Sequence, residues 1–411
     1  MSFLIGLKRK RGADKDMAPS NHLTDSDLAA KMIEAQDSII SHRSGKATAT
    51  VLDTPEPTST HGAEAFKNDA DYFRQRAELE RRERTLAFDH ACAQNATPEE
   101  IRANGILQRL KRRDRRRVYS AAPPRTGFGG QVHPRREGDH YLSNAPLIAR
   151  TDVFQLARRM PKGAHLHIHF NSCLPPAVLL GVAAGMERMF ITSDIPLTPE
   201  DDFSAFWRCE IQFSMLPPER EVPGDLFSAG YTPRQTMRYQ EFLAKFANSG
   251  YPHTAEEWLT QKLAFSEDEA HDKLQTSYGA WAKFNARTRM MKGLFNYERA
   301  YRTYTRLCLE DFVADNIQYA EIRPNFMKTN QLFTDDASAM IDNKGIMDII
   351  IDEYERFQKE TDRYFAGLRV IYCTPRSFSN KDVEFALDEC LEFKQKWPKW
   401  IAGVSPLLPS A

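Results

Sequence analysis

The pattern of apolar and polar positions divides the chain into three parts. Residues 1 to about 65 are rich in Ser, Thr, Asp, Ala and Pro and show little apolar periodicity, which predicts a disordered tail that proteases can remove. Over residues 66–150, apolar positions recur at helical spacing among many Glu and Arg, and a Pro/Gly-rich stretch follows at 121–146. We therefore expect a helical extension and a linker before a folded domain that begins near residue 151.

From residue 151 on, segments with the two-residue period of strands alternate with segments of helical period. This order is typical of a parallel sheet, either open or closed into a barrel. The stretch from about 171 to 285 does not fit a single crossover helix, so we expect a helical insertion after the first strand. The expected elements are a short helix from a cap at Asp152, a strand at 164–170, a long amphipathic helix at 290–312, strands at 317–322 and 368–373, helices at 346–360 and from a cap at Ser379, and a fourth strand opening at 400–403.

The composition is that of a globular protein. With 411 residues, 41% of them hydrophobic and 27% charged, the chain can bury a sizeable core. Lys+Arg and Asp+Glu each number 56, so the zero formal net charge gives no overall attraction to nucleic acid or acidic lipid. No apolar run approaches the ~20 residues of a membrane span, and the apolar patch at the start is too short for a signal-peptide core. We expect a cytoplasmic protein without a membrane partner.

Several charged groups invite a functional interpretation. The basic runs Lys8–Arg11 and Lys111–Arg117 have the composition of nuclear-import or nucleic-acid patches, but we favour a solvent-exposed helix surface for the second and do not expect nucleic acid as a partner. Glu321 and Arg323, at the end of the second strand, are expected to pair in a structural role. The acidic residues of the last helix are expected to form its solvent face; they are Asp382, Glu384, Asp388, Glu389 and Glu392.

The first expected strand carries the most distinctive chemistry. His167 and His169 are two residues apart, so their imidazoles would point to one face and lie close enough to share a metal ion. His165 would fall on the same face, one step earlier. The alternative is a polar strand face without a metal. Two histidines do not complete a zinc site, because zinc takes three or four protein ligands.

Ordered segments of the chain resemble the adenosine deaminase family. Met160–His169 resembles the family's first-strand motif P-K-x-x-L-H-x-H, which supplies its first two zinc ligands. Tyr319–Arg323, Arg369–Cys373 and Trp400–Gly403 resemble its second strand, its third strand and the opening of its fourth. The resemblance covers roughly residues 63–403 and marks His167 and His169 as the metal ligands.

Two flanking segments resemble one branch of that family. Met290–Glu298, which reads MMKGLFNYE, and Cys373–Phe378, which reads CTPRSF, are similar to extracellular deaminase-related growth factors and their fungal-type relatives. A secreted location, as in that branch, is therefore the alternative to a cytoplasmic one. A homodimer is also compatible with the resemblance.

The resemblance implies a fold and an activity. The fold would be the N-terminal part of a TIM-type (β/α)8 metallohydrolase barrel, with about four strands present. In such enzymes Zn²⁺ polarises a water that attacks C6 of adenosine or a related purine nucleoside, giving inosine and ammonia. Asn171 stands where many relatives have an acid that contacts the ribose, so we expect it to bind substrate.

The end of the chain departs from the family. Val404–Ala411 does not continue the family pattern, and we expect its two prolines to prevent it from extending a central strand. The family's third zinc His, catalytic Glu, orienting His and zinc-binding Asp come from later strands, whereas the last histidine here is His271. We therefore expect a C-terminally truncated deaminase with an incomplete zinc site, unknown catalytic residues and no activity alone. The alternative is a non-catalytic relative that binds a nucleoside, a protein or nucleic acid.

Overall fold

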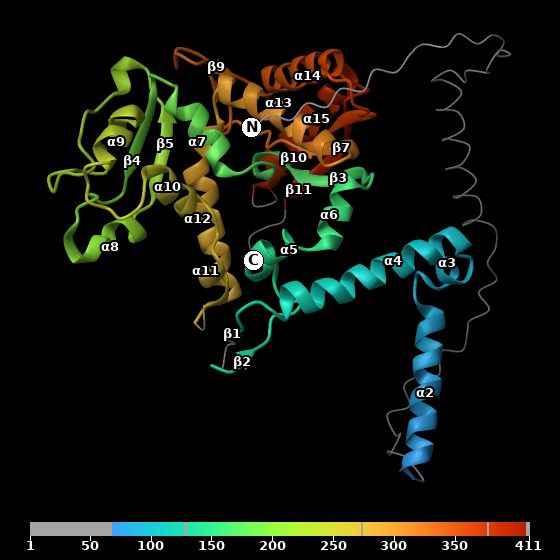
Figure 1. Ribbon diagram of the computed structural model, residues 1–411. Helices are drawn as coiled ribbons and strands as arrows, with labels where there is room; N and C mark the ends of the chain where they lie inside the picture. Colours follow the sequence, from blue (N-terminus) through green and yellow to red (C-terminus); the bar gives the residue numbers. More distant parts are fainter. Residues whose placement is uncertain (1–67, 127–129, 273, 376–377, 408–411) are drawn as a thin grey trace, which may run out of the picture. The chain divides into compact units, whose positions relative to one another are not determined.

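The computed structural model describes residues 68–126, 130–272, 274–375 and 378–407 (Figure 1). The expected tail at residues 1–65 and the basic run Lys8–Arg11 lie outside the described residues. The chain divides into two compact units, residues 1–95 and 96–411. Within the described ranges, none of the helices combines the length and the apolar character that crossing a membrane requires.

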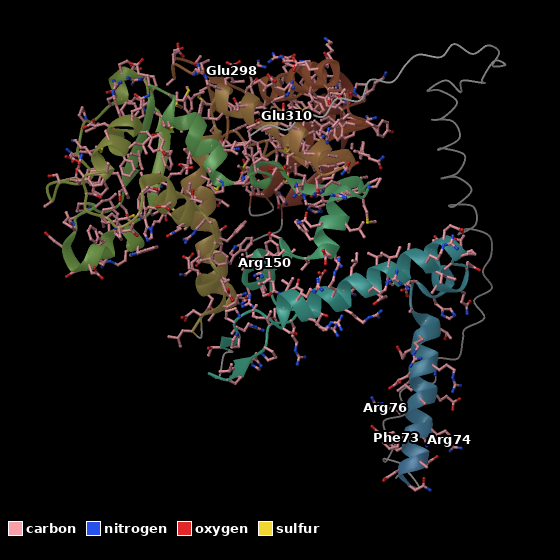
Figure 2. All side chains as sticks on the ribbon, in the orientation of Figure 1. Phe73, Arg74, Arg76, Arg150, Glu298 and Glu310 are labelled. Atoms are coloured by element: carbon pink, nitrogen blue, oxygen red, sulfur yellow. The ribbon has the colours of Figure 1, made fainter. Side chains whose placement is uncertain are left out.

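The described part of the first unit consists of α2 (Asp69–Leu86) and α3 (His90–Gln94). The side chain of Asn68 caps α2 by accepting a hydrogen bond from the Asp71 amide at 2.9 Å. No residue of α2 is buried, and even Phe73 is 61% exposed (Figure 2). These helices agree with the helical pattern expected from residue 66.

The second unit begins with helices that include the expected extension. They are α4 (Pro98–Asp114), a π-helical turn η1 (Arg115–Tyr119), α5 (Tyr141–Ile148) and α6 (Asp152–Arg159), with a small antiparallel pair, β1 (Arg125–Thr126) and β2 (Val132–His133), between η1 and α5. The helix expected from Asp152 is confirmed, but its cap is Thr151, whose side chain accepts from the Phe154 amide at 3.2 Å. The segment 121–146 is thus not a linker throughout, since α5 begins within it.

Asp114 gives the basic run Lys111–Arg117 a structural role. Its carboxylate is only 4% exposed and accepts hydrogen bonds from the backbone amides of Asp152 and Val153, at 2.9 and 3.0 Å. It therefore joins the end of α4 to the start of α6, where the first amides of a helix lack partners of their own. The adjacent Arg113 adds an ion pair with Asp152 at 2.5 Å.

We expect Asp114→Ala to lower the free energy of unfolding by about 1–3 kcal/mol, because it leaves two amides in the first turn of α6 unpaired. Urea unfolding followed by circular dichroism measures the change. The matched control is Arg112→Ala, which alters an exposed residue of the same run and should stay within about 0.5 kcal/mol of the wild type. Equal losses in the two variants would contradict the structural role of Asp114.

The centre of the second unit is a parallel sheet of four strands (Figure 1). Its order is β11 (Ile401–Leu407), β10 (Gly367–Pro375), β7 (Ile317–Arg323) and β3 (Gly163–His169), and each neighbouring pair is parallel. The helices α13 (Glu298–Ala314), α14 (Asn343–Glu360) and α15 (Asn380–Lys396) alternate with these strands along the chain. The expected α/β fold with four parallel strands is confirmed, and within the described residues the sheet is open between β3 and β11.

The long helix expected at 290–312 is instead two helices. The first, α12 (Ser277–Phe295), ends before Asn296, and α13 begins at Glu298. The Asn296 carbonyl accepts a hydrogen bond from the Phe333 amide at 3.0 Å, and Tyr297 is extended and forms a β-bridge with Phe333. Tertiary pairing with the small hairpin of β8 (Leu332–Phe333) and β9 (Met340–Ile341) therefore interrupts the helix at a point where the apolar period continues.

The insertion after the first strand is not purely helical, contrary to expectation. It contains an antiparallel sheet of β5 (Ile211–Met215), β4 (Met189–Ser193) and β6 (Met237–Arg238). The remaining elements are η2 (Phe170–Ser172), α7 (Pro176–Ala184), α8 (Glu200–Arg208), η3 (Pro218–Arg220), α9 (Tyr239–Phe246), α10 (Ala255–Leu263) and α11 (Glu267–His271). Several of its aromatic residues are buried, among them Phe206, Phe242 and Phe246, whereas Trp207 and Trp281 are exposed. Trp258 is fully buried, and its Nε1 donates to the Phe206 carbonyl at 3.1 Å.

Two features near the carboxyl end of the chain differ from the expected pattern. Strand β11 runs to Leu407, with Pro406 opposite Thr374. A proline is tolerated there because β11 is an edge strand of the described sheet. Within α15, capped by Ser379 as expected, Glu389 does not face solvent: its carboxylate accepts from Asn343 Nδ2 at 2.7 Å and from the Tyr372 hydroxyl at 2.6 Å.

Candidate functional site

The three histidines of β3 do not lie on one face of the sheet. His165 pairs with Ala320 and Ile168 with Ile322, so β3 has one more residue than β7 between these two pairs. Such a bulge shifts the alternation of side chains. His165 therefore shares the face of the buried Ala320, and its ring lies 6.2 Å from that of Phe312 in α13. The prediction that His165 faces the same way as His167 and His169 is wrong.

His167 and His169 do lie together at the carboxyl end of β3. Their ring centroids are 5.6 Å apart with an angle of 53° between the planes. His167 is exposed and His169 is half-buried. Two imidazoles at this separation fit as two ligands of one zinc ion, whose bonds to nitrogen are about 2.0–2.1 Å long. Among the described residues no group of three His, Cys, Asp or Glu side chains is placed to hold a metal, so the pair supplies only part of a zinc site.

Arg323 lies beside this pair and was not recognised as a site residue from the sequence. It is 8% exposed, and its Nη1 donates to the Leu166 carbonyl at 2.9 Å and to the Glu321 carbonyl at 3.4 Å. The expected pairing of Arg323 with the Glu321 carboxylate does not occur. That carboxylate instead accepts a hydrogen bond from the Tyr319 hydroxyl at 2.9 Å. Leu166 precedes His167 in β3. Arg323 therefore links β7 to the part of β3 that contains the two histidines.

Burial lowers the pKa of His169, and the neighbouring His167 and Arg323 lower it further. We expect the His169 ring to titrate below the ordinary value of ~6.5. Because the unfolded chain then binds the proton more readily, the stability that His169 contributes is present above pH ~6.5 and is lost as the pH falls through the folded-state pKa. Ring NMR signals, assigned with His169→Gln, measure this, and a midpoint at or above ~6.5 would contradict it.

Asn171 lines a cavity of about 190 Å³ next to the histidine pair in sequence. It lies in the turn η2, and its Oδ1 accepts only a long hydrogen bond from Ser172 Oγ, at 3.4 Å. Asn325, beyond the end of β7, and Lys292 of α12 line the same cavity. Neither residue stands out in the sequence, although a polar residue after a parallel strand is where such folds place binding groups.

Comparison with known proteins shows a similarity to adenosine deaminases. No protein-family model matches the sequence. The chain is 24% identical over 307 residues to adenosine deaminase 2 of Sus scrofa, and this aligned region covers 74% of this chain and 53% of that protein. It is 25% identical over 264 residues to an adenosine deaminase of Aedes albopictus, covering 64% and 44%. The chain thus spans about half the length of these relatives.

A solved structure with a partly similar backbone is an amidohydrolase from Burkholderia ambifaria with bound zinc. The TM-score is 0.32 and the sequence identity 13%, over 66% of this chain and 48% of that one.

An open parallel β/α sheet with paired histidines at the carboxyl end of one strand defines an α/β protein whose candidate site lies at its strand ends. Over about two thirds to three quarters of its length, the chain is similar to adenosine deaminases.

Proposed function

We propose that this chain carries part of the site of a zinc-dependent hydrolase that deaminates adenosine, or a related purine nucleoside, to inosine and ammonia. The observation that carries the proposal is the pair His167 and His169, with rings 5.6 Å apart at the carboxyl end of β3. The names of the curated relatives support deamination of this substrate class.

In the proposed site, each residue has a separate role. His167 and His169 would hold a zinc ion through ring nitrogens, and that ion would supply the Lewis acidity that activates a water in such hydrolases. Only a neutral imidazole binds a metal, and the burial that lowers the pKa of His169 favours that form. Arg323 is a positioning residue, because it holds the backbone immediately before His167 through the Leu166 carbonyl. The Asn171 carboxamide contacts the substrate from the adjoining cavity.

The described residues supply two zinc ligands, and zinc needs three or four. We therefore propose that the 411-residue chain does not turn over adenosine by itself and that residues equivalent to the second half of its relatives complete the centre.

An absorbance assay of inosine formation tests this proposal on two proteins. The first is the chain alone, for which we expect no measurable turnover. The second joins residues 1–403 to the remaining part of the Sus scrofa relative, for which we expect zinc-dependent turnover that His167→Ala reduces at least about 100-fold. Turnover by the chain alone, or by the joined protein irrespective of His167, would refute the proposed roles.

A further inference from the structure

The cavity that Asn171 lines, two residues beyond His169, is built from strand ends and one helix. Its walls include Asn171 after β3, Pro324 and Asn325 after β7, and Met291, Lys292 and Phe295 of α12. Its volume of about 190 Å³ is below the ~300–1,000 Å³ of pockets that enclose a whole small ligand. It therefore fits one part of a substrate whose reacting part lies at the histidines.

The cavity carries an uncompensated positive charge. Among the described residues no Asp or Glu lines it, and the two cations are Arg289 and Lys292. Arg289 is neutralised by Glu210, whose carboxylate accepts from Nε and Nη2 at 2.9 and 2.8 Å. Lys292 donates only to the Thr329 carbonyl, at 2.5 Å, and has no carboxylate partner within the described ranges. Partial burial lowers the pKa of Lys292, as expected for an ammonium group without a counter-charge.

Two carboxamides in the cavity are free to bind a ligand. Asn325 Oδ1 is buried and has no hydrogen-bond partner in the described part of the chain. The Asn171 side chain is engaged only by the 3.4 Å contact from Ser172. The other two asparagines of the lining differ, because Asn296 Nδ2 donates to Asn330 Oδ1 at 2.9 Å. A buried polar atom without a partner lowers stability, and a bound hydroxyl or phosphate would satisfy such groups.

We propose that this cavity binds the phosphate-bearing end of the substrate, so that the site prefers a purine nucleoside 5′-monophosphate to the free nucleoside. The inference rests on the proposed deaminase function and specifies its substrate. A phosphate monoester carries about −1.5 to −2 charges at pH 7, which Lys292 complements. The amide of Asn171 can donate to a phosphate oxygen, and Asn325 Oδ1 can accept from a ribose hydroxyl. The neutral amide of Asn171 does not repel a phosphate, whereas a carboxylate at this position would.

Titration calorimetry on the full chain tests the preference, with adenosine 5′-monophosphate, adenosine and inorganic phosphate as probes. We expect the monophosphate to bind about 10- to 100-fold more tightly than adenosine at low salt. Lys292→Met should remove this difference. Asn171→Asp should weaken binding of the monophosphate more than binding of adenosine. Lys328→Met is the matched control, because the Lys328 ammonium lies 3.7 Å from the centre of the Phe385 ring and does not line this cavity.

Three other outcomes would refute the inference, and each has a different meaning. Equal affinities for the monophosphate and adenosine would refute the phosphate preference and leave the deaminase function standing. Equal losses in Lys292→Met and Lys328→Met, with both proteins folded by circular dichroism, would mean general charge attraction and no phosphate site. Binding of phosphate alone as tightly as the monophosphate, or of no probe at all, would refute the substrate and count against the deaminase function as well.

Discussion

Gly293→Ala will lower the free energy of unfolding by about 3 kcal/mol or more. A methyl group built at Gly293 would overlap the backbone carbonyl of Phe213 in β5. Because the obstructing atoms are backbone, they cannot move aside as a flexible side chain would, and α12 must shift away from β5. Gly293 is the glycine of the MMKGLFNYE segment, so close packing of a helix on a strand explains that position.

The matched control is Gly181→Ala in α7, where an added methyl group meets no atom within 4 Å. A helix-interior alanine there should leave stability unchanged or raise it by up to about 1 kcal/mol. Guanidinium unfolding curves of the two variants and the wild type measure both effects. A Gly293→Ala protein within about 0.5 kcal/mol of the wild type would show that α12 and β5 are not packed backbone to backbone.

The sequence predicted the four parallel strands because each lies within an ordered alternation of strand and helix patterns. It did not predict the β4–β5–β6 sheet. The run Met189–Ser193 is short and largely buried, and such a run has no period that separates a strand from a helix. The helix break at Asn296 was also hidden, since Tyr297 and Tyr301 continue the helical period across it.

The candidate site was predictable in part. Spacing and resemblance identified His167 and His169, and the structure brings their rings together. The two-residue period predicted that His165 faces the same way as the pair. The bulge in β3 that turns His165 away arises from pairing with β7, which the sequence of β3 alone does not encode. Arg323 was expected to pair with Glu321, and only the strand register shows that it reaches the Leu166 carbonyl. The cavity of Asn325 and Lys292 joins residues distant along the chain, so no local pattern predicts it.

Zinc binding by the 411-residue chain will be weak and will depend on both histidines. After dialysis against a mild chelator we expect far less than one zinc per chain, because two imidazoles leave the coordination of zinc incomplete. Loss of an outer-shell contact costs 10- to 100-fold in metal affinity, so His167→Ala and His169→Ala should each cost at least about 100-fold. His165→Ala is the control and should retain the wild-type affinity, since His165 lies against Phe312. Stoichiometric zinc that resists the chelator would contradict an incomplete site.

The most direct test of the account is a zinc titration followed by the ring NMR signals of the β3 histidines. The rings of His167 and His169 are 5.6 Å apart, whereas His165 is on the opposite face of β3. We predict that the signals of His167 and His169 change together at the same zinc concentration while that of His165 stays in place. Zinc binding that leaves the His167 and His169 signals unchanged would contradict the account.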